Sequence, residues 1–417
     1  MSPLPALPDF APRLRHGVVE FPLHHMRGGT STGLVIHDRL APADLALREE
    51  LLRHLMGLPL TGTSTGNRQI TGLGRGPATS NKVFFADLEA GDRIVSTLAQ
   101  LAADTAAIDW SVNCGNMSAA LPLWALDTGL LTRAPGAGVF APVIRNTNTG
   151  VLTATRMEFD VAGRAATAEI PGVNGAFAAV DLALADPVGS KTGRLLPTGN
   201  RTDICAGITV SCVDVAVPMV IARADAFGRS AQDPIETLDS DPALMARLRE
   251  VWVAAGLAMG LAARDGRKLT AAELARSETI PKFCLVGPPE RGGHIAARYF
   301  TPQQGHRSMA VSGGCCLAAA ALIPGTIAHQ VARGLPALGT AATTVAVGIE
   351  NPAGILGARV TACATPDGLA LTEAAYVRST QILLRGHVPL PRASAALGLA
   401  LIGNTPQESV NSETAGM

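Results

Sequence analysis

Lys82 and Cys114 are the two side chains of this sequence whose surroundings best suit proton exchange with a ligand. Lys82 stands between the polar run 78–81 and the apolar run 83–88, where partial burial would lower the pKa of its amine and let it act as a base. Cys114 lies among asparagine and glycine just before an apolar helix, where unpaired backbone N–H groups favour a thiolate and can face an anion. The structural alternatives are a lysine whose stem covers apolar surface and a cysteine that packs as a small apolar residue.

Four polar, glycine-containing stretches follow apolar segments, at residues 25–33, 72–82, 113–116 and 311–316. Glycine lets the backbone approach a ligand closely, and Ser and Thr add hydroxyl donors, so these stretches predict cradles for a carboxylate or a phosphate. Arg27 suits bidentate binding of a carboxylate, with an ion pair as the alternative. For Cys315 and Cys316 the alternative is buried packing. The candidate binding residues are Arg27, Gly28, Gly29, Thr30, Ser31, Ser80, Asn81, Asn113, Gly115, Asn116, Met117, Ser312, Gly313, Gly314 and Cys315.

Composition excludes several classes of partner. The chain has 34 basic and 34 acidic residues without long runs of one sign, which argues against nucleic acid and against a polybasic membrane site. The apolar run 251–263 is too short to cross a bilayer. Neither a G-x-G-x-x-G nor a GxxxxGK[ST] motif occurs, and the seven cysteines form no metal-binding cluster. We therefore expect a small-molecule ligand, no metal, and a cytoplasmic protein with reduced thiols.

The pattern of apolar runs predicts two similar halves. Strands are expected at 33–38, 81–88, 92–102 and 150–161, and helices at 41–57, with Asp44 in the first turn, and from Cys114 to near Gly129. The second half repeats this order with strands, a helix at 241–263, and a small-residue turn at 312–316 that opens an apolar helix. The expected strands of this half are 203–223, 282–288, 343–351 and 357–365. We predict domains 1–187 and 188–387, with the segment 388–417 joined to the first and residues 1–15 as a loose extension.

Five segments taken together resemble the PrpF family: MRGGTSTG, GLGRGPATSNKVFF, WSVNCGN, PKFCLVGPP and HRSMAVSGGCCLAAAALIPGT. The likeness runs in order from about residue 18 to 395. It implies the α+β fold of diaminopimelate epimerase, with two similar domains, each a curled, mostly antiparallel sheet around a central helix, and a site in the cleft between them. It also implies proton transfer without a cofactor by a lysine and a cysteine, which map onto Lys82 and Cys114.

These observations lead us to expect an isomerase that moves a proton and a double bond in a small unsaturated di- or tricarboxylate. Aconitate, methylaconitate and oxalomesaconate are examples of such acids. Lys82 would remove the proton and Cys114, facing it across the cleft between the domains, would return one. The alternatives are an epimerase or racemase of a small carboxylate, and a non-catalytic carboxylate-binding protein that assists an aconitase-like dehydratase. No membrane or nucleic-acid partner is expected, and self-association is left open.

Overall fold

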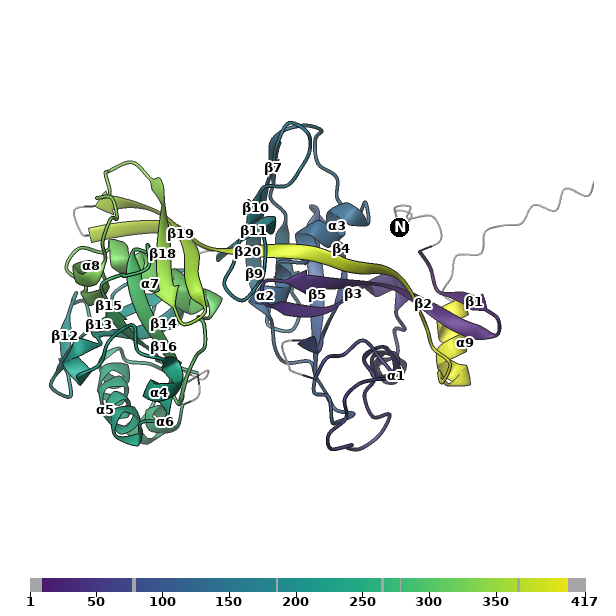
Figure 1. The fold of residues 1–417 in the computed structure, drawn as a ribbon, viewed down its shortest axis with the longest axis horizontal. Helices are drawn as coiled ribbons and strands as arrows, with labels where there is room; N and C mark the ends of the chain where they lie inside the picture. The colour runs from purple at the N-terminus through teal and green to yellow at the C-terminus, as the bar shows by residue number, and fades with distance from the viewer. Residues whose placement is uncertain are drawn as a thin grey trace, which may run out of the picture. The chain divides into compact units, whose positions relative to one another are not determined.

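The computed structural model describes residues 10–76, 80–184, 187–263, 266–277, 279–365 and 368–403 (Figure 1). Contacts divide the chain into two compact units. Unit 1 comprises Met1–Pro135, Pro142–Val151 and Thr380–Met417, and unit 2 comprises Gly136–Ala141 and Leu152–Ser379. The predicted boundary after residue 187 therefore falls inside unit 2, because residues 152–187 make their contacts with that unit.

Unit 1 is built on five strands in a mixed sheet. They are β2 (Val18–Gly28), β3 (Ser31–His37), β4 (Lys82–Glu89), β5 (Arg93–Leu101) and β8 (Val143–Asn146). β2 and β3 pair antiparallel, β3 and β4 parallel, β4 and β5 antiparallel, and β5 and β8 parallel. The helix α1 (Leu45–Met56) connects β3 to β4, because a parallel neighbour needs a crossover connection.

Helices cover both faces of the sheet in unit 1. Successive strand residues point to opposite faces, and Leu34 and Val83 pack in one core cluster with Leu51 and Leu55 of α1. Asp44 caps α1 through a hydrogen bond from the backbone N–H of Leu47 at 3.0 Å, which confirms the predicted start.

The opposite face contacts α3 (Leu121–Asp127), where the rings of His37 and Trp124 lie 6.0 Å apart. Asp127 of the same helix lies 3.0 Å from the ring nitrogen Nε2 of His24 on β2. By alternation, Lys82 at the start of β4 belongs to this second face, since Val83 belongs to the face of α1.

Unit 2 repeats the strand order of unit 1. Its strands are β13 (Ile208–Val215), β14 (Val217–Arg223), β15 (Lys282–Gly287), β16 (Ile295–Thr301) and β18 (Thr343–Asn351). Their pairings run antiparallel, parallel, antiparallel and parallel, as in unit 1. Phe283 and Leu285 pack toward α5 (Pro242–Ala258), whereas Cys284 and Val286 pack toward α7 (Val311–Leu322). The prediction of two similar α+β domains with a central helix is confirmed.

Shorter elements complete the fold. Arg13–Arg15 form β1, which pairs with β2, so this part of the predicted loose extension is a strand. One long strand, β20 (Gly368–Pro389), pairs with β19 (Gly354–Thr365) up to Tyr376 and with β2 from Thr380 on. The remaining elements are η1 (Asp38–Leu40), β6 (Ile108–Asp109), α2 (Gly115–Ser118), β7 (Gly138–Phe140), β9 (Leu152–Phe159), β10 (Thr167–Ala168), β11 (Phe177–Leu184), β12 (Asp203–Cys205), η3 (Asp225–Phe227), α4 (Ile235–Asp239), α6 (Ala271–Arg276), β17 (Gln304–Gly305), α8 (Ile327–Val331) and α9 (Ala395–Gly403).

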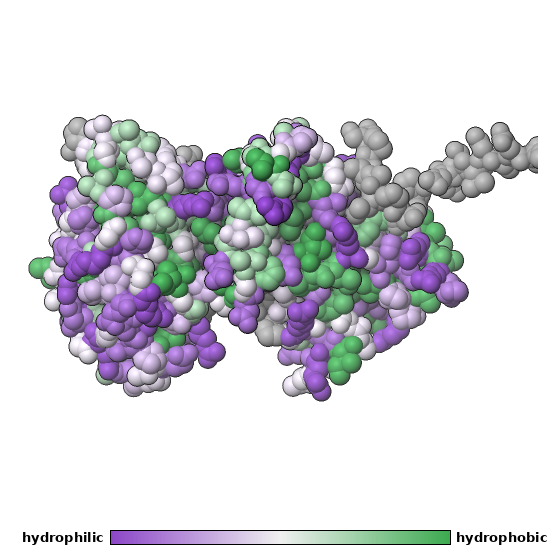
Figure 2. All heavy atoms as spheres, turned by 45° about the horizontal axis from the view of Figure 1, so that its top comes forward, coloured by the Kyte–Doolittle hydropathy of each residue, from purple (hydrophilic) through white to green (hydrophobic). Residues whose placement is uncertain are grey.

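Hydrophilic and hydrophobic residues are interspersed over the face shown in Figure 2. Within the described residues, no helix combines the length and the apolarity that crossing a lipid bilayer requires.

Candidate active site

The hairpin of β2 and β3 brings the first glycine-rich stretch against the turn that carries Cys114. Only Gly29 and Thr30 form the turn, with Gly29 at φ 55°, so most of the predicted turn 25–33 is strand. A Cβ atom on Gly28 would lie 2.6 Å from the carbonyl oxygen of Asn116, so only glycine allows this backbone contact. The Asn116 side chain also donates a hydrogen bond to the Thr30 hydroxyl at 3.2 Å.

Cys114 occupies the N-cap position of α2. Its Sγ accepts a hydrogen bond from the backbone N–H of Met117 at 3.5 Å, while its own N–H donates to the Asn113 side chain at 2.7 Å. The thiol is thus fixed at a junction of loop and helix and stays partly exposed. The helix predicted from here to Gly129 is divided into α2 and α3.

Lys82 is the first residue of β4 and is only 7% exposed. Its Nζ donates a hydrogen bond to the side-chain oxygen of Gln100, which lies directly opposite on β5. Gln100 in turn donates to the backbone oxygen of Asn81 at 3.0 Å, so the amide has a fixed orientation. Gln100 is a site residue that the sequence patterns do not predict. The local sign of its role is that it is a polar residue in the apolar end of β5.

Two opposing effects act on the Lys82 amine. Burial lowers its pKa below the ordinary value, because the charged form loses hydration, and the negative charge of a Cys114 thiolate raises it. Cys114 is therefore close enough for its charge to act on the Lys82 amine. Both belong to unit 1, which corrects the expectation that they face each other from different domains.

Two other predicted residues of unit 1, Asn81 and Arg27, form hydrogen bonds that hold neighbouring backbone in place. Asn81 is fully buried, and its amide exchanges two hydrogen bonds with Gln69, at 2.9 and 3.0 Å, and donates a third to Gly76. It therefore secures the connection between α1 and β4. Residues 77–79 of the second polar stretch lie outside the described residues. Arg27 donates from Nη1 to the Gly29 carbonyl at 2.9 Å and so braces the hairpin turn. Its contact with a ligand stays a prediction.

The predicted residues of the second half belong to α7 in unit 2. The stretch 312–316 lies inside the first turns of this helix, which begins at Val311, so the predicted turn is wrong. Its glycines admit two aromatic rings: a Cβ on Gly313 would lie 2.5 Å from the ring of Tyr299, and one on Gly314 would lie 2.3 Å from the ring of Tyr376. Cys315 has no exposed surface, and burial raises the pKa of its thiol to about 12.

Among the described residues, no three His, Cys, Asp or Glu side chains gather in a way that could hold a metal ion. The reaction expected from the sequence asks for none, and that expectation stays a prediction.

Comparison with known proteins places this geometry in context. A family model described as "PrpF protein" matches residues 18–391. The chain is 34% identical over 325 residues to the 4-oxalomesaconate tautomerase of Pseudomonas putida, covering 76% of this chain and 83% of the relative. It is 30% identical over 391 residues to the 3-methylitaconate isomerase of Eubacterium barkeri, covering 88% and 96%. The crystal structure of a methylitaconate-delta-isomerase matches with a TM-score of 0.73 at 27% identity, covering 94% of this chain and 99% of that one.

Proposed function

Because the chain belongs to the PrpF family and is an isomerase, we propose that it moves a proton and a double bond within a small unsaturated di- or tricarboxylate, without a cofactor. The observation that carries this proposal is the pairing in unit 1 of an amine whose pKa burial lowers with a thiol whose charge acts on it. Relatives named for oxalomesaconate and methylitaconate support the class of substrate.

Lys82 is the base in this mechanism. Its neutral amine takes a proton from a carbon next to a carboxylate or a conjugated carbonyl, and the C–H electron pair delocalises into a dienolate. Burial favours the neutral amine before the substrate arrives. The hydrogen bond to Gln100 uses an N–H of the amine, which a neutral amine can donate without using its lone pair.

Cys114 is the acid. The thiol gives its proton to the far carbon of the allylic system, or to the same carbon after rotation, and a new C–H bond forms as the dienolate collapses. The products are an ammonium at Lys82 and a thiolate at Cys114. Each charge stabilises the other, and transfer of a proton from the Lys82 ammonium to the Cys114 thiolate, directly or through water, restores the starting state.

The hairpin turn is proposed to hold one carboxylate of the substrate. Arg27 supplies a cation beside the turn, and Thr30 supplies a hydroxyl on the side that contacts Asn116. Donors that are fixed before the reaction stabilise the charge that develops on the dienolate at little reorganisation cost.

The test is deuterium exchange in D₂O with a panel containing cis-aconitate, trans-aconitate, methylaconitate, oxalomesaconate and methylitaconate, followed by proton NMR. The wild type should incorporate deuterium into at least one acid while its double bond moves or changes configuration. Lys82→Met and Cys114→Ser should each lose about 10²–10⁴-fold in rate. Lys191→Met, which changes an exposed lysine, should match the wild type.

The other outcomes separate the alternatives. Binding of an acid by the wild type without any deuterium incorporation would support the accessory protein. Exchange at the stereocentre of a saturated acid, with no action on the unsaturated ones, would support the epimerase. An unchanged rate in Lys82→Met would remove the proposed base.

A further inference from the structure

Gln100 faces the Lys82 amine from the neighbouring strand. The two residues lie directly opposite each other in the antiparallel pair of β4 and β5, and opposite residues of such a pair point to the same face of the sheet. The same face of β5 carries the fully buried Ile94 and Leu98. An apolar residue would therefore be the ordinary choice at position 100, and the amide there needs a reason.

The orientation of the Gln100 amide is fixed by its nitrogen. The Nε2 atom donates hydrogen bonds to the backbone oxygen of Asn81 at 3.0 Å and to that of Leu101 at 3.2 Å. If the amide turned over, its NH₂ group would face the Lys82 amine and both of these hydrogen bonds would be lost. The amide therefore meets the amine with its oxygen, as a hydrogen-bond acceptor.

The backbone that holds the amide is itself anchored. The Asn81 backbone oxygen also accepts a hydrogen bond from the N–H of Leu101 at 3.0 Å. The Asn81 side chain exchanges hydrogen bonds with Gln69, which is 1% exposed and donates to the backbone oxygen of Met56 at 2.9 Å. A connected series of hydrogen bonds thus runs from the end of α1 to the Lys82 amine and fixes where that amine lies.

The groups next to Lys82 are mostly uncharged. The charge that acts on its amine is that of a Cys114 thiolate on α2. On the flanking strands the neighbours are Gly33 of β3 and the amide of β5, and neither titrates. Arg27 of β2 directs one guanidinium nitrogen to the carbonyl of Gly29.

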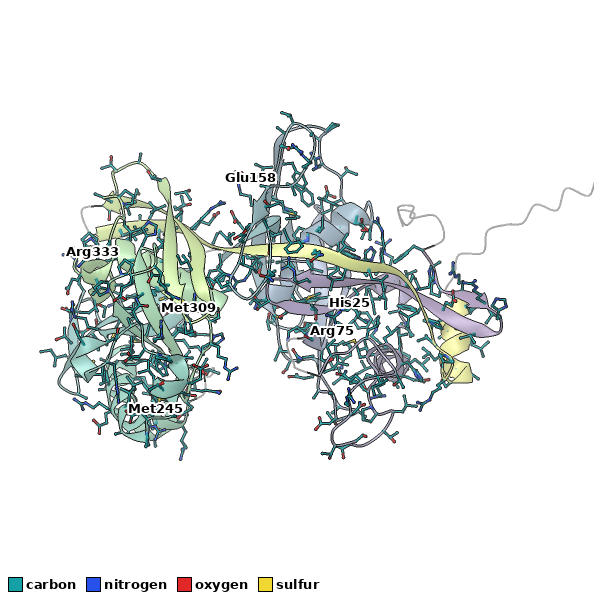
Figure 3. The ribbon with its side chains drawn as sticks, viewed as in Figure 1. His25, Arg75, Glu158, Met245, Met309 and Arg333 are labelled. Carbon is teal, nitrogen blue, oxygen red and sulfur yellow. The ribbon has the colours of Figure 1, made fainter. Side chains whose placement is uncertain are left out.

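Other charged groups on the neighbouring elements act on one another. Asp127 of α3 forms an ion pair with Arg385 and lies 3.0 Å from the ring of His24 on β2. Arg75, in the connection between α1 and β4, acts on His25 of β2, and Figure 3 shows these two residues close together. None of these described groups is among the causes that shift the pKa of the β4 amine.

A neutral acceptor suits a base that must be uncharged before the substrate arrives. Burial lowers the pKa of Lys82, and a carboxylate in place of the amide would oppose this effect by stabilising the ammonium. An apolar side chain at position 100 would remove the acceptor and with it the direction that the amide gives to the amine.

We propose that Gln100 is a positioning residue that holds the Lys82 amine in the site and, being uncharged, leaves it able to accept a proton. The inference rests on the proposed function, and it adds a residue that acts on the base and not on the substrate.

The test compares Gln100→Glu with Gln100→Met, two residues of similar size. Both variants lose the hydrogen bonds from Nε2, so a merely structural role would affect them alike. Only Gln100→Glu adds a negative charge beside the amine, and it should raise the pKa of Lys82 by about 1 to 3. Gln100→Met should not raise it.

The pKa can be measured without a substrate. Lysine occurs only at positions 82, 191, 268 and 282, so the full chain labelled with ¹³C at the lysine Cε gives four signals in a pH titration by NMR. The Lys82 signal is the one that is missing from Lys82→Met. Circular dichroism checks that each variant is folded.

Turnover gives a second measurement with the acid that the wild type converts best. In Gln100→Glu the acidic limb of the pH profile of kcat/KM should move up by the same amount as the pKa, because that limb reports the base of the free enzyme. In Gln100→Met the limb should not move up, but kcat should fall about 10- to 100-fold through loss of orientation.

The matched control is Gln303→Glu in unit 2. The Gln303 amide also donates to two backbone oxygens, those of Ala275 and Ser277, and its oxygen also accepts from a cation, Arg249. This variant should keep the wild-type pKa of Lys82 and the wild-type pH profile.

Two results decide against the inference in different ways. A Lys82 pKa in folded Gln100→Glu within 0.3 of the wild type, an order-of-magnitude threshold of about twofold in the neutral fraction, would overturn it while the proposed function stands. A wild type that converts no acid of the panel would overturn the proposed function, and the inference with it, even if the titration shows the expected rise.

Discussion

Replacing Gly33 by alanine should impair the reaction without removing any group that takes part in it. Gly33 lies on β3 beside the first residue of β4, and a Cβ atom there would be 2.3 Å from the backbone oxygen of Lys82 and 3.1 Å from its Cβ. Real Cβ atoms essentially never approach another atom within 3.0 Å. The backbones at Gly33 and Lys82 must therefore separate by about 0.7 Å, the difference between 3.0 and 2.3 Å.

A displacement of this size is large for a base that must meet a C–H bond. Misplacement of a reacting group by about 1 Å costs roughly 10²-fold in rate, so Gly33→Ala should lower kcat by about 10- to 100-fold. The pH profile should keep its shape, since the amine and the thiol are both present. Stability should fall by about 1–3 kcal/mol through overpacking. Deuterium exchange at saturating substrate, with circular dichroism as the check on folding, measures both effects.

The matched control is Gly386→Ala. Gly386 is a strand glycine of unit 1 in β20, and a Cβ there would meet no atom within 4 Å. This variant should keep the wild-type kcat. A folded Gly33→Ala protein with kcat within threefold of the wild type would refute the reasoning, because Lys82 would then either tolerate the shift or not be the base.

Four further variants test stability. Burial lowers the pKa of Lys282 from 10.5 to about 8, which corresponds to a loss of roughly 3 kcal/mol in the free energy of unfolding. This loss is complete below pH 8, where the amine is charged in both states, and it disappears as the pH rises to 10.5. In urea unfolding, the free energy of unfolding of Lys282→Met should exceed that of the wild type most at pH 7 and little near pH 10.5. An equal difference at both pH values would contradict the lowered pKa. Gly314→Ala should lower the unfolding temperature, because the 2.3 Å approach to Tyr376 outweighs a helix-propensity gain of about 1 kcal/mol. Gly398→Ala in α9, whose nearest neighbour would be at 3.7 Å, should raise it instead. Asp44→Ala should cost about 1 kcal/mol by removing the cap of α1, and no change would mean that water replaces the cap.

Much of the fold could be predicted from the sequence, because the order of neighbouring residues determines where these helices and strands begin. The run 343–351 alternates apolar and small residues and forms β18 over the same nine residues. Asp44 marks the start of α1, and the polar-to-apolar change at Lys82 marks the start of β4. The N-cap role of Cys114 follows from the same reasoning, because Asn and Gly around it allow a turn that ends in a helix.

The errors arise where distant residues decide the local structure. Gly313 and Gly314 have the appearance of a turn, but they are helical because rings from β16 and β20 pack where their side chains would be. The strand β20 gives no clear signal, since its two ends pair with different strands, β19 and β2, and so face different surroundings. The unpaired hydroxyl of Tyr299 could not be predicted from the sequence for a related reason, because it is recognised only once its neighbours are known.

The two units share an order of strands but differ at the residue that precedes the central helix. In unit 1 a thiol stands there, and the lysine at the start of the equivalent strand has a fixed partner in Gln100. In unit 2 an alanine stands there, and the equivalent Lys282 forms no ion pair among the described residues. We infer that unit 1 carries the proton-transfer groups, because unit 2 has no titratable side chain at the residue before its central helix.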